Sequence, residues 1–273
     1  IAQSSSVDGF NINISGTNKY EDTKNSDVII ITAGIPRKPG MTRDDLLGIN
    51  LKIIKQVAEG IKITSPKAFV ICITNPLDVI VMALQKHSGF AKNMVVGMAG
   101  ILDTSRFKYF LSQELNVPVK KINSLVLGGH GDTMVSMLNH TTIDGKPILD
   151  LVKEGKLKQD SLDFIIKRTK SGGAEIVKLL EKGSAFYAPA ASGVEMAESY
   201  LMDLKKQLPC AVYLNGEYGV KDLYAGVPVI IGKNGIEKIV EIDLNNQEKK
   251  DFDHSISAVQ ELFAAAKKID NLL

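Results

Sequence analysis

The stretch Asp-Val-Ile-Ile-Ile-Thr-Ala-Gly at residues 27–34 indicates the fold class of this 273-residue chain. Uninterrupted runs of β-branched residues are typical of parallel strands covered on both faces. A second such run, Ala-Phe-Val-Ile-Cys-Ile-Thr, occupies residues 68–74 and stops at Asn75-Pro76. Between the two runs, apolar residues at helical spacing from Leu46 to Ile61 predict an amphipathic helix. The pattern therefore predicts βαβ units and a parallel sheet.

The neighbouring segments extend this pattern. Phe10, Ile12 and Ile14 alternate with polar residues and predict a strand with one buried face. A helix is expected over residues 77–88, followed by a short strand around residues 95 and 96. We therefore predict an α/β fold with a Rossmann-type parallel sheet, which binds its ligands beyond the carboxyl ends of the strands.

The pattern of expected helices and strands changes in the second half of the chain, which predicts an α+β domain with antiparallel strands. We place the boundary near Gly97, with a dinucleotide-binding domain at 1–97 and a catalytic domain at 98–273. A break between two helices is expected at Gly172-Gly173. The remaining expected helices cover residues 103–115, 161–180, 190–206 and 248–273, and the expected strands cover residues 123–127, 133–143, 212–215, 227–231 and 237–242.

Composition excludes several classes of protein. The 33 basic and 31 acidic residues nearly balance, so no general attraction to nucleic acid or to an anionic membrane is expected. Cys72 and Cys210 do not form a Cys-x-x-Cys pair, which favours buried thiols in a reducing compartment over a disulfide or a metal site. No apolar run reaches the roughly 20 residues that cross a bilayer, and no signal peptide is recognisable. We expect a cytoplasmic protein.

The candidate chemistry centres on Gly-Gly-His-Gly at residues 128–131. Asp103 and Arg106 are three residues apart on an expected helix, so both would project from one face. If that face meets His130, the carboxylate can orient the imidazole and raise its pKa, which would make a reversible acid and base. Taken singly, the histidine could be a turn residue, and the Asp–Arg pair could be a surface salt bridge.

A loop rich in Pro and Gly follows the first buried run. It covers residues 34–41 and carries Arg37, while Arg43 follows at the start of the next helix. Solvated surface cations are the alternative interpretation of both arginines, and Asn75 could be an ordinary turn residue.

Taken together, these motifs resemble the NAD-dependent lactate and malate dehydrogenase family, most closely its lactate-dehydrogenase-like bacterial malate dehydrogenases. The resemblance covers essentially the whole chain. It rests on Ile-Thr-Ala-Gly at 31–34, Pro-Arg-Lys-Pro-Gly-Met-Thr-Arg at 36–43, Ile-Thr-Asn-Pro-Leu-Asp at 73–78, Leu-Asp-Thr-Ser-Arg at 102–106 and Gly-Gly-His-Gly-Asp at 128–132.

The resemblance implies a role for each matching residue. His130 would donate and accept the proton, and Asp103 would orient it. Arg106 would bind the α-carboxylate of the substrate, Arg43 would polarise the reacting C–O group, and Asn75 would contact the substrate oxygen and the nicotinamide. The implied cofactor is NAD, with contacts from Gly34, Asn50, Ile73, Thr74 and Asn75. The family also implies a homodimer or homotetramer and a place in the tricarboxylic acid cycle.

Arg37 would select the substrate. Lactate-specific relatives have an uncharged residue at the matching loop position, whereas an arginine there would neutralise the second carboxylate of malate or oxaloacetate. Leaving that carboxylate unpaired away from water would be costly. We therefore expect malate dehydrogenase activity; a lactate dehydrogenase is the alternative.

One family feature has no counterpart. The sequence contains neither a Gly-x-Gly-x-x-Gly phosphate loop nor the acidic residue expected about 20 positions after it. We expect either that this is part of a longer enzyme or that it is a non-catalytic subunit that binds NAD poorly. The apolar surface of residues 28–31 is then expected to be exposed.

Overall fold

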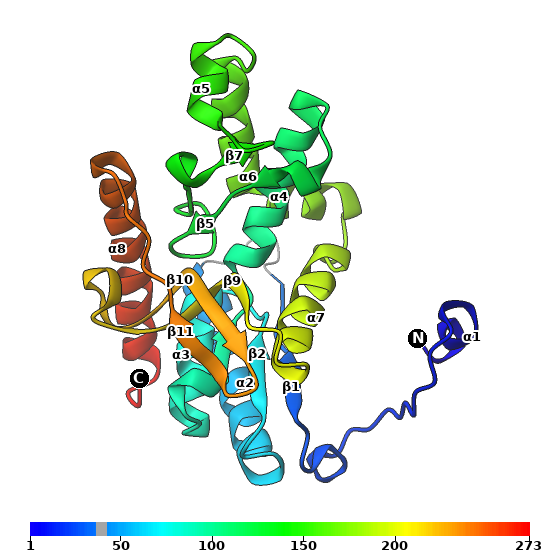
Figure 1. Cartoon of the computed structure of the whole chain (residues 1–273). Helices are drawn as coiled ribbons and strands as arrows, with labels where there is room; N and C mark the ends of the chain where they lie inside the picture. The colour runs from blue at the N-terminus through cyan, green and yellow to red at the C-terminus, as the bar shows by residue number, and fades with distance from the viewer. Residues whose placement is uncertain (37–42) are drawn as a thin grey trace.

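A six-stranded sheet forms the centre of the computed structural model, which describes residues 1–36 and 43–273 (Figure 1). Its order is β1-β2-β3-β9-β10-β11. The parallel part contains β1 (Val28–Ile31), β2 (Phe69–Cys72) and β3 (Val95–Gly97). The antiparallel part contains β9 (Lys206–Asn215), β10 (Lys221–Gly232) and β11 (Gly235–Ile239). The mixed α/β fold with a parallel Rossmann-type sheet is therefore confirmed.

Helices cover this sheet, because their apolar faces pack against its apolar side chains. The two long helices α2 (Arg43–Thr64) and α3 (Leu77–Ser88) connect the parallel strands, and α3 is buried along most of its length. The closing helix α8 (Asn246–Ile269) packs on α2, α3 and β10, while α7 (Tyr187–Leu201) packs on β1, β2 and β10. The sheet and these helices share one hydrophobic core that runs from Ile31 to Leu273.

A second, smaller core lies above the sheet in Figure 1, between α4 (Gly100–Leu115), α5 (Ile148–Lys153) and α6 (Gln159–Leu180). Three short strands contribute residues to it: β4 (Ile122–Asn123), β5 (Val126–Leu127) and β7 (Thr142–Ile143). Strand β6 (Val135–Ser136) pairs with β5, and β8 (Lys146–Pro147) pairs with β7. The remaining elements are α1 (Ser5–Asp8) and 3-10 turns at Ala2–Ser4, Tyr20–Thr23, Lys92–Met94, Val119–Lys121, Leu138–His140 and Glu217–Gly219.

Several local predictions were wrong. Residues 10–14 form no strand, and Ile12 and Ile14 are exposed because no described strand lies beside them. The expected strand over residues 133–143 is reduced to β6 and β7 around a 3-10 turn. The last three strands were expected to be short, yet β9 and β10 pair along nearly their whole lengths. Helix α6 continues through Gly172 and Gly173, where a break was expected.

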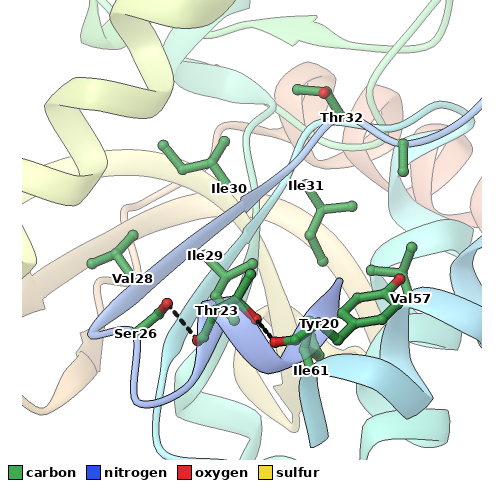
Figure 2. A pocket seen from close by; sticks show the side chains of 11 residues that line it. Tyr20, Thr23, Ser26, Val28, Ile29, Ile30, Ile31, Thr32, Val57 and Ile61 are labelled. Carbon is green, nitrogen blue, oxygen red and sulfur yellow. Dashed lines mark hydrogen bonds between the residues drawn. The ribbon is translucent and has the colours of Figure 1, made fainter. Parts of the chain in front are cut away.

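Strand β1 is the first strand of the sheet and pairs only with β2 among the described strands. As expected, part of its apolar surface is open, since Ile30 is 42% exposed, although Ile31 is buried. Beside it lies a hollow of about 420 Å³, lined by β1, by Tyr20 and by Val57 and Ile61 of α2 (Figure 2). None of the described residues proposed for the chemistry lines this hollow.

The end of β5 is joined to the central sheet by a close backbone contact. The backbone N–H of Gly128 donates to the carbonyl of Gly226 at 2.8 Å, and the N–H of Gly226 donates back at 3.0 Å. A Cβ atom on Gly226 would lie 2.6 Å from the Gly128 oxygen. Only glycine at position 226 allows the chain beyond β5 to lie this close to β10.

We predict that Gly226→Ala destabilises the protein by about 1–3 kcal/mol, because backbone must move to accept the methyl group. Chemical denaturation measures the change. The control is Gly16→Ala, where an added Cβ has no neighbour within 4 Å. Equal free energies of unfolding for the two variants would contradict the packing argument.

Candidate active site

His130 and Asp103 form a buried pair. Nδ1 of His130 lies 2.8 Å from Oδ2 of Asp103, and the side chains are 14% and 2% exposed respectively. A carboxylate can only accept a hydrogen bond, so Nδ1 carries the proton. The chain beyond β5 supplies the histidine and α4 supplies the aspartate. The structure thus brings together two residues that the sequence placed 27 positions apart.

Arg106 joins the pair of His130 and Asp103. Its Nη1 lies 3.4 Å from the other carboxylate oxygen of Asp103, one turn away on α4. The side chain rests on α6, where a Cβ on Gly172 would lie 3.0 Å from Cδ of Arg106. This contact gives Gly172 a packing role within a continuous helix. The cost of a glycine inside a helix is only about 1 kcal/mol, and the helix continues.

The pKa of His130 is raised above its ordinary value. Burial opposes the charge of the imidazolium, but the negative charge of Asp103, its hydrogen bond and the charge of Asp78 together outweigh burial, while Arg106 acts with burial. The pKa of Arg106 is lowered by burial, against the attraction of Asp103. A histidine of this kind can hold a proton near neutral pH and release it when a substrate needs it.

A second carboxylate also contacts His130. The backbone N–H of His130 donates to Oδ2 of Asp78 at 2.8 Å. Asp78 lies in the first turn of α3 and is buried. Sequence analysis assigned it no role, although it closes the motif at residues 73–78. Burial raises its pKa to about 6, opposed by the backbone hydrogen bond and the positive charge of His130.

The glycines beside His130 have mostly structural explanations. The N–H of Gly129 donates to Oγ of Ser255 in α8 at 2.9 Å. Added Cβ atoms on Gly128 and Gly129 would meet Ser255 Oγ and Val259 Cγ2, each at 2.5 Å. Gly131 faces open space. Close packing on α8 therefore explains two of the three glycines, and only Gly131 adds open space beside the histidine.

The residues proposed to bind the cofactor gather at the carboxyl ends of β1 and β2. Oδ1 of Asn50 accepts the N–H of Ile35 at 2.9 Å, and Nδ2 donates to the carbonyl of Asn75 at 2.7 Å. Thr74 donates to the carbonyl of Ala33. A Cβ on Gly34 would lie 2.6 Å from Thr74. These contacts fix the two loops against each other.

The other two cofactor candidates lie on the same edge. Ile73 is half-buried, and its backbone N–H donates to Ile31 in β1. The side chain of Asn75 is exposed beside the cis Asn75–Pro76 peptide. Asp78 follows three residues later and accepts a hydrogen bond from the backbone N–H of His130. This hydrogen bond links the segment around Asn75 to the segment that carries His130.

For two of the predicted site residues, the structure describes no side chain. Arg37 lies outside the described residues, and Arg43 begins α2 but its side chain is not among those described. Within residues 1–36 and 43–273, no three His, Cys, Asp or Glu side chains form a cluster that could hold a metal ion. None of the described helices is both long and apolar enough to span a membrane.

Two sequence families match the chain. Residues 2–97 match the lactate/malate dehydrogenase NAD binding domain, and residues 101–270 match the lactate/malate dehydrogenase alpha/beta C-terminal domain. The chain belongs to the lactate/malate dehydrogenase family. A malate dehydrogenase of Pelagibacter ubique is 73% identical over 270 residues, which cover 99% of this chain and 84% of that protein.

Solved structures of the same family superpose well. A malate dehydrogenase of Cryptosporidium parvum is 49% identical, with a TM-score of 0.93 over 96% of this chain and 84% of that one. A lactate dehydrogenase of the same organism, complexed with lactic acid and nicotinamide adenine dinucleotide, is 44% identical, also with a TM-score of 0.93, over 99% of this chain and 84% of that one.

We predict that Asp103→Asn lowers the pKa of His130. The substitution keeps an oxygen acceptor but removes the negative charge that opposes burial, so the charged ring loses its main stabilisation. NMR titration of the imidazole measures the midpoint, with His130→Gln to assign the signal. An unchanged or higher midpoint would show that Asp103 does not control this histidine.

Proposed function

We propose that the chain is an NAD-dependent malate dehydrogenase that interconverts malate and oxaloacetate. The observation that carries this proposal is the shared carboxylate of Asp103, with His130 on one oxygen and Arg106 on the other. The 73% identity to a malate dehydrogenase supports the choice of substrate.

In this proposal His130 is the acid and base. Because Nδ1 is held by Asp103, Nε2 is the nitrogen that exchanges a proton with the substrate. The neutral ring takes the hydroxyl proton during oxidation of malate, and the charged ring returns it during reduction of oxaloacetate. Asp103 stabilises the imidazolium, so a raised pKa favours the form needed for reduction.

Arg106 is proposed to bind the carboxylate next to the reacting carbon. A guanidinium presents two parallel donors to a carboxylate. Its position on the same Asp103 carboxylate as His130 would fix the distance between the anchored carboxylate and the proton-transfer atom. Arg43 is proposed to polarise the C–O bond as negative charge develops on oxygen, and Asn75 to contact that oxygen.

Bound NAD supplies the acceptor and donor of the hydride. The carboxyl ends of β1 and β2 suit its nicotinamide end, where Gly34, Ile73, Thr74 and Asn75 line the edge and the Asn75 side chain is exposed. Asn50 uses its amide to join the two loops, so it would shape the site rather than bind the cofactor directly. The sequence has no Gly-x-Gly-x-x-Gly loop, so this proposal concerns that end alone.

Lactate dehydrogenase activity is the second candidate, because lactate dehydrogenases are among the solved relatives. Arg37 favours a dicarboxylate substrate, since its charge would pair the second carboxylate. A non-catalytic subunit that binds NAD poorly is a third possibility. We also propose a domain boundary near Gly97, a homodimeric or homotetrameric assembly, a cytoplasmic location and a role in the tricarboxylic acid cycle.

We predict faster oxidation of NADH with oxaloacetate than with pyruvate. Absorbance at the NADH band, followed at equal substrate concentrations, gives kcat/KM for each acid. A higher value for pyruvate would reject the malate assignment. NADH binding, followed by fluorescence, tests the third possibility separately, since failure to bind would support it.

We predict that Arg37→Gln reduces kcat/KM for oxaloacetate by about 30-fold to several thousandfold, the cost of leaving a carboxylate unpaired. The value for pyruvate should change little, because pyruvate has no second carboxylate. Lys38→Gln removes a neighbouring charge and serves as the control. Equal losses for both substrates would show that Arg37 does not select between them.

A further inference from the structure

Asp78 is a buried carboxylate with one oxygen in use. It is 6% exposed. Oδ2 accepts the backbone N–H of His130 at 2.8 Å, whereas Oδ1 has no hydrogen-bond partner among the described residues. A buried polar atom without a partner lowers stability, so its presence calls for an explanation.

The position of Asp78 links the two halves of the site. It lies three residues after Asn75, in the first turn of α3, and so directly follows the loop that leaves β2. A Cβ atom on Gly129 would lie 3.6 Å from Oδ2 of Asp78, so the segment that carries His130 packs closely against this carboxylate. The carboxylate therefore holds the His130 backbone against the edge where the cofactor candidates gather.

Among the side chains that the structure describes, the charged groups near His130 come from two elements. Helix α4 contributes Asp103 and Arg106, and α3 contributes Asp78. From α8, the neighbours of this loop are Ser255 and Val259, neither of which is charged. Two carboxylates thus face one guanidinium around the imidazole, and the balance favours the imidazolium.

We propose that Asp78 is a positioning residue for proton transfer, which fixes the His130 loop through its backbone and adds a second negative charge beside the imidazole. The anchoring of the loop rests on the hydrogen bond from the His130 N–H to Oδ2 of Asp78 at 2.8 Å, and the effect on catalysis rests on the proposed function. With a pKa of about 6, Asp78 is mostly ionised at neutral pH and supports the charged ring together with Asp103.

A purely structural role would be stabilisation of α3, since a carboxylate in the first turn interacts favourably with the helix dipole. The two roles differ in what a neutral amide would change. Asp78→Asn keeps the shape and an oxygen acceptor for the His130 N–H but removes the charge. A structural role alters stability alone, whereas the proposed role also alters the titration of His130.

Glu248→Gln is the matched control. Glu248 is also a buried carboxylate in the first turn of a helix, and it also accepts a backbone N–H, from Asn139 at 3.1 Å. It does not act on His130. Removing its charge therefore reproduces the helix and burial effects without the proposed effect on the imidazole.

The experiment is NMR titration of the His130 ring in the unsubstituted protein, in Asp78→Asn and in Glu248→Gln. We expect the midpoint in Asp78→Asn to move to lower pH, while Glu248→Gln leaves it unchanged. A midpoint in Asp78→Asn equal to that of the unsubstituted protein overturns the proposal, whatever happens to stability.

A measurement on the unsubstituted protein covers the case in which Asp78→Asn fails to fold. The His130 ring signals should show a second, smaller step on the acid side of the main one, as the Asp78 carboxyl, whose pKa is raised to about 6, takes up a proton. That step should be absent in a folded Asp78→Asn protein. A single step in the unsubstituted protein contradicts the proposed coupling.

Enzyme assays then separate the proposed role of Asp78 from the proposed malate dehydrogenase function. In Asp78→Asn, kcat/KM for oxaloacetate should fall on the alkaline side of the pH profile by about threefold or more, because less imidazolium is present there. If the unsubstituted protein does not reduce oxaloacetate, the proposed function fails while the NMR result still decides the role of Asp78.

Discussion

The site depends on one buried charge, the carboxylate of Asp103. A buried charge is costly unless it is paired and hydrogen-bonded, and here His130 and Arg106 use one oxygen of Asp103 each. The helix that carries it is fixed to β5, since Oγ1 of Thr104 accepts the N–H of Val126 at 2.9 Å. This arrangement joins the imidazole of His130 and the guanidinium of Arg106 through one carboxylate.

Close backbone packing is the second constraint, and glycines make it possible. Gly226 allows the chain after β5 to lie on β10, Gly128 and Gly129 allow it to lie on α8, and Gly172 leaves room for Arg106. None of these glycines needs to touch a substrate. They determine where the imidazole and the guanidinium lie, so residues outside the chemistry fix its geometry.

The elements that the sequence predicted well have strong local patterns. The apolar runs at β1 and β2 and the helix α3 could be predicted, because uniform apolar runs and Pro or Gly boundaries are signals that span only a few residues. Residues 10–14 had the alternation of a strand without a described neighbour to pair with. The glycine pair in α6 was misread because its cause, Arg106, lies on another helix.

By itself, the sequence determined the parallel strands, the intervening helices and, through its resemblance to a family, the candidates His130, Asp103 and Arg106. Only the tertiary structure decided how they meet. It also revealed Asp78, which is 52 positions from His130, and Ser255, which is 126 positions from Gly129. Contacts across such separations leave no local periodicity in the chain, because they arise when distant elements pack into one core.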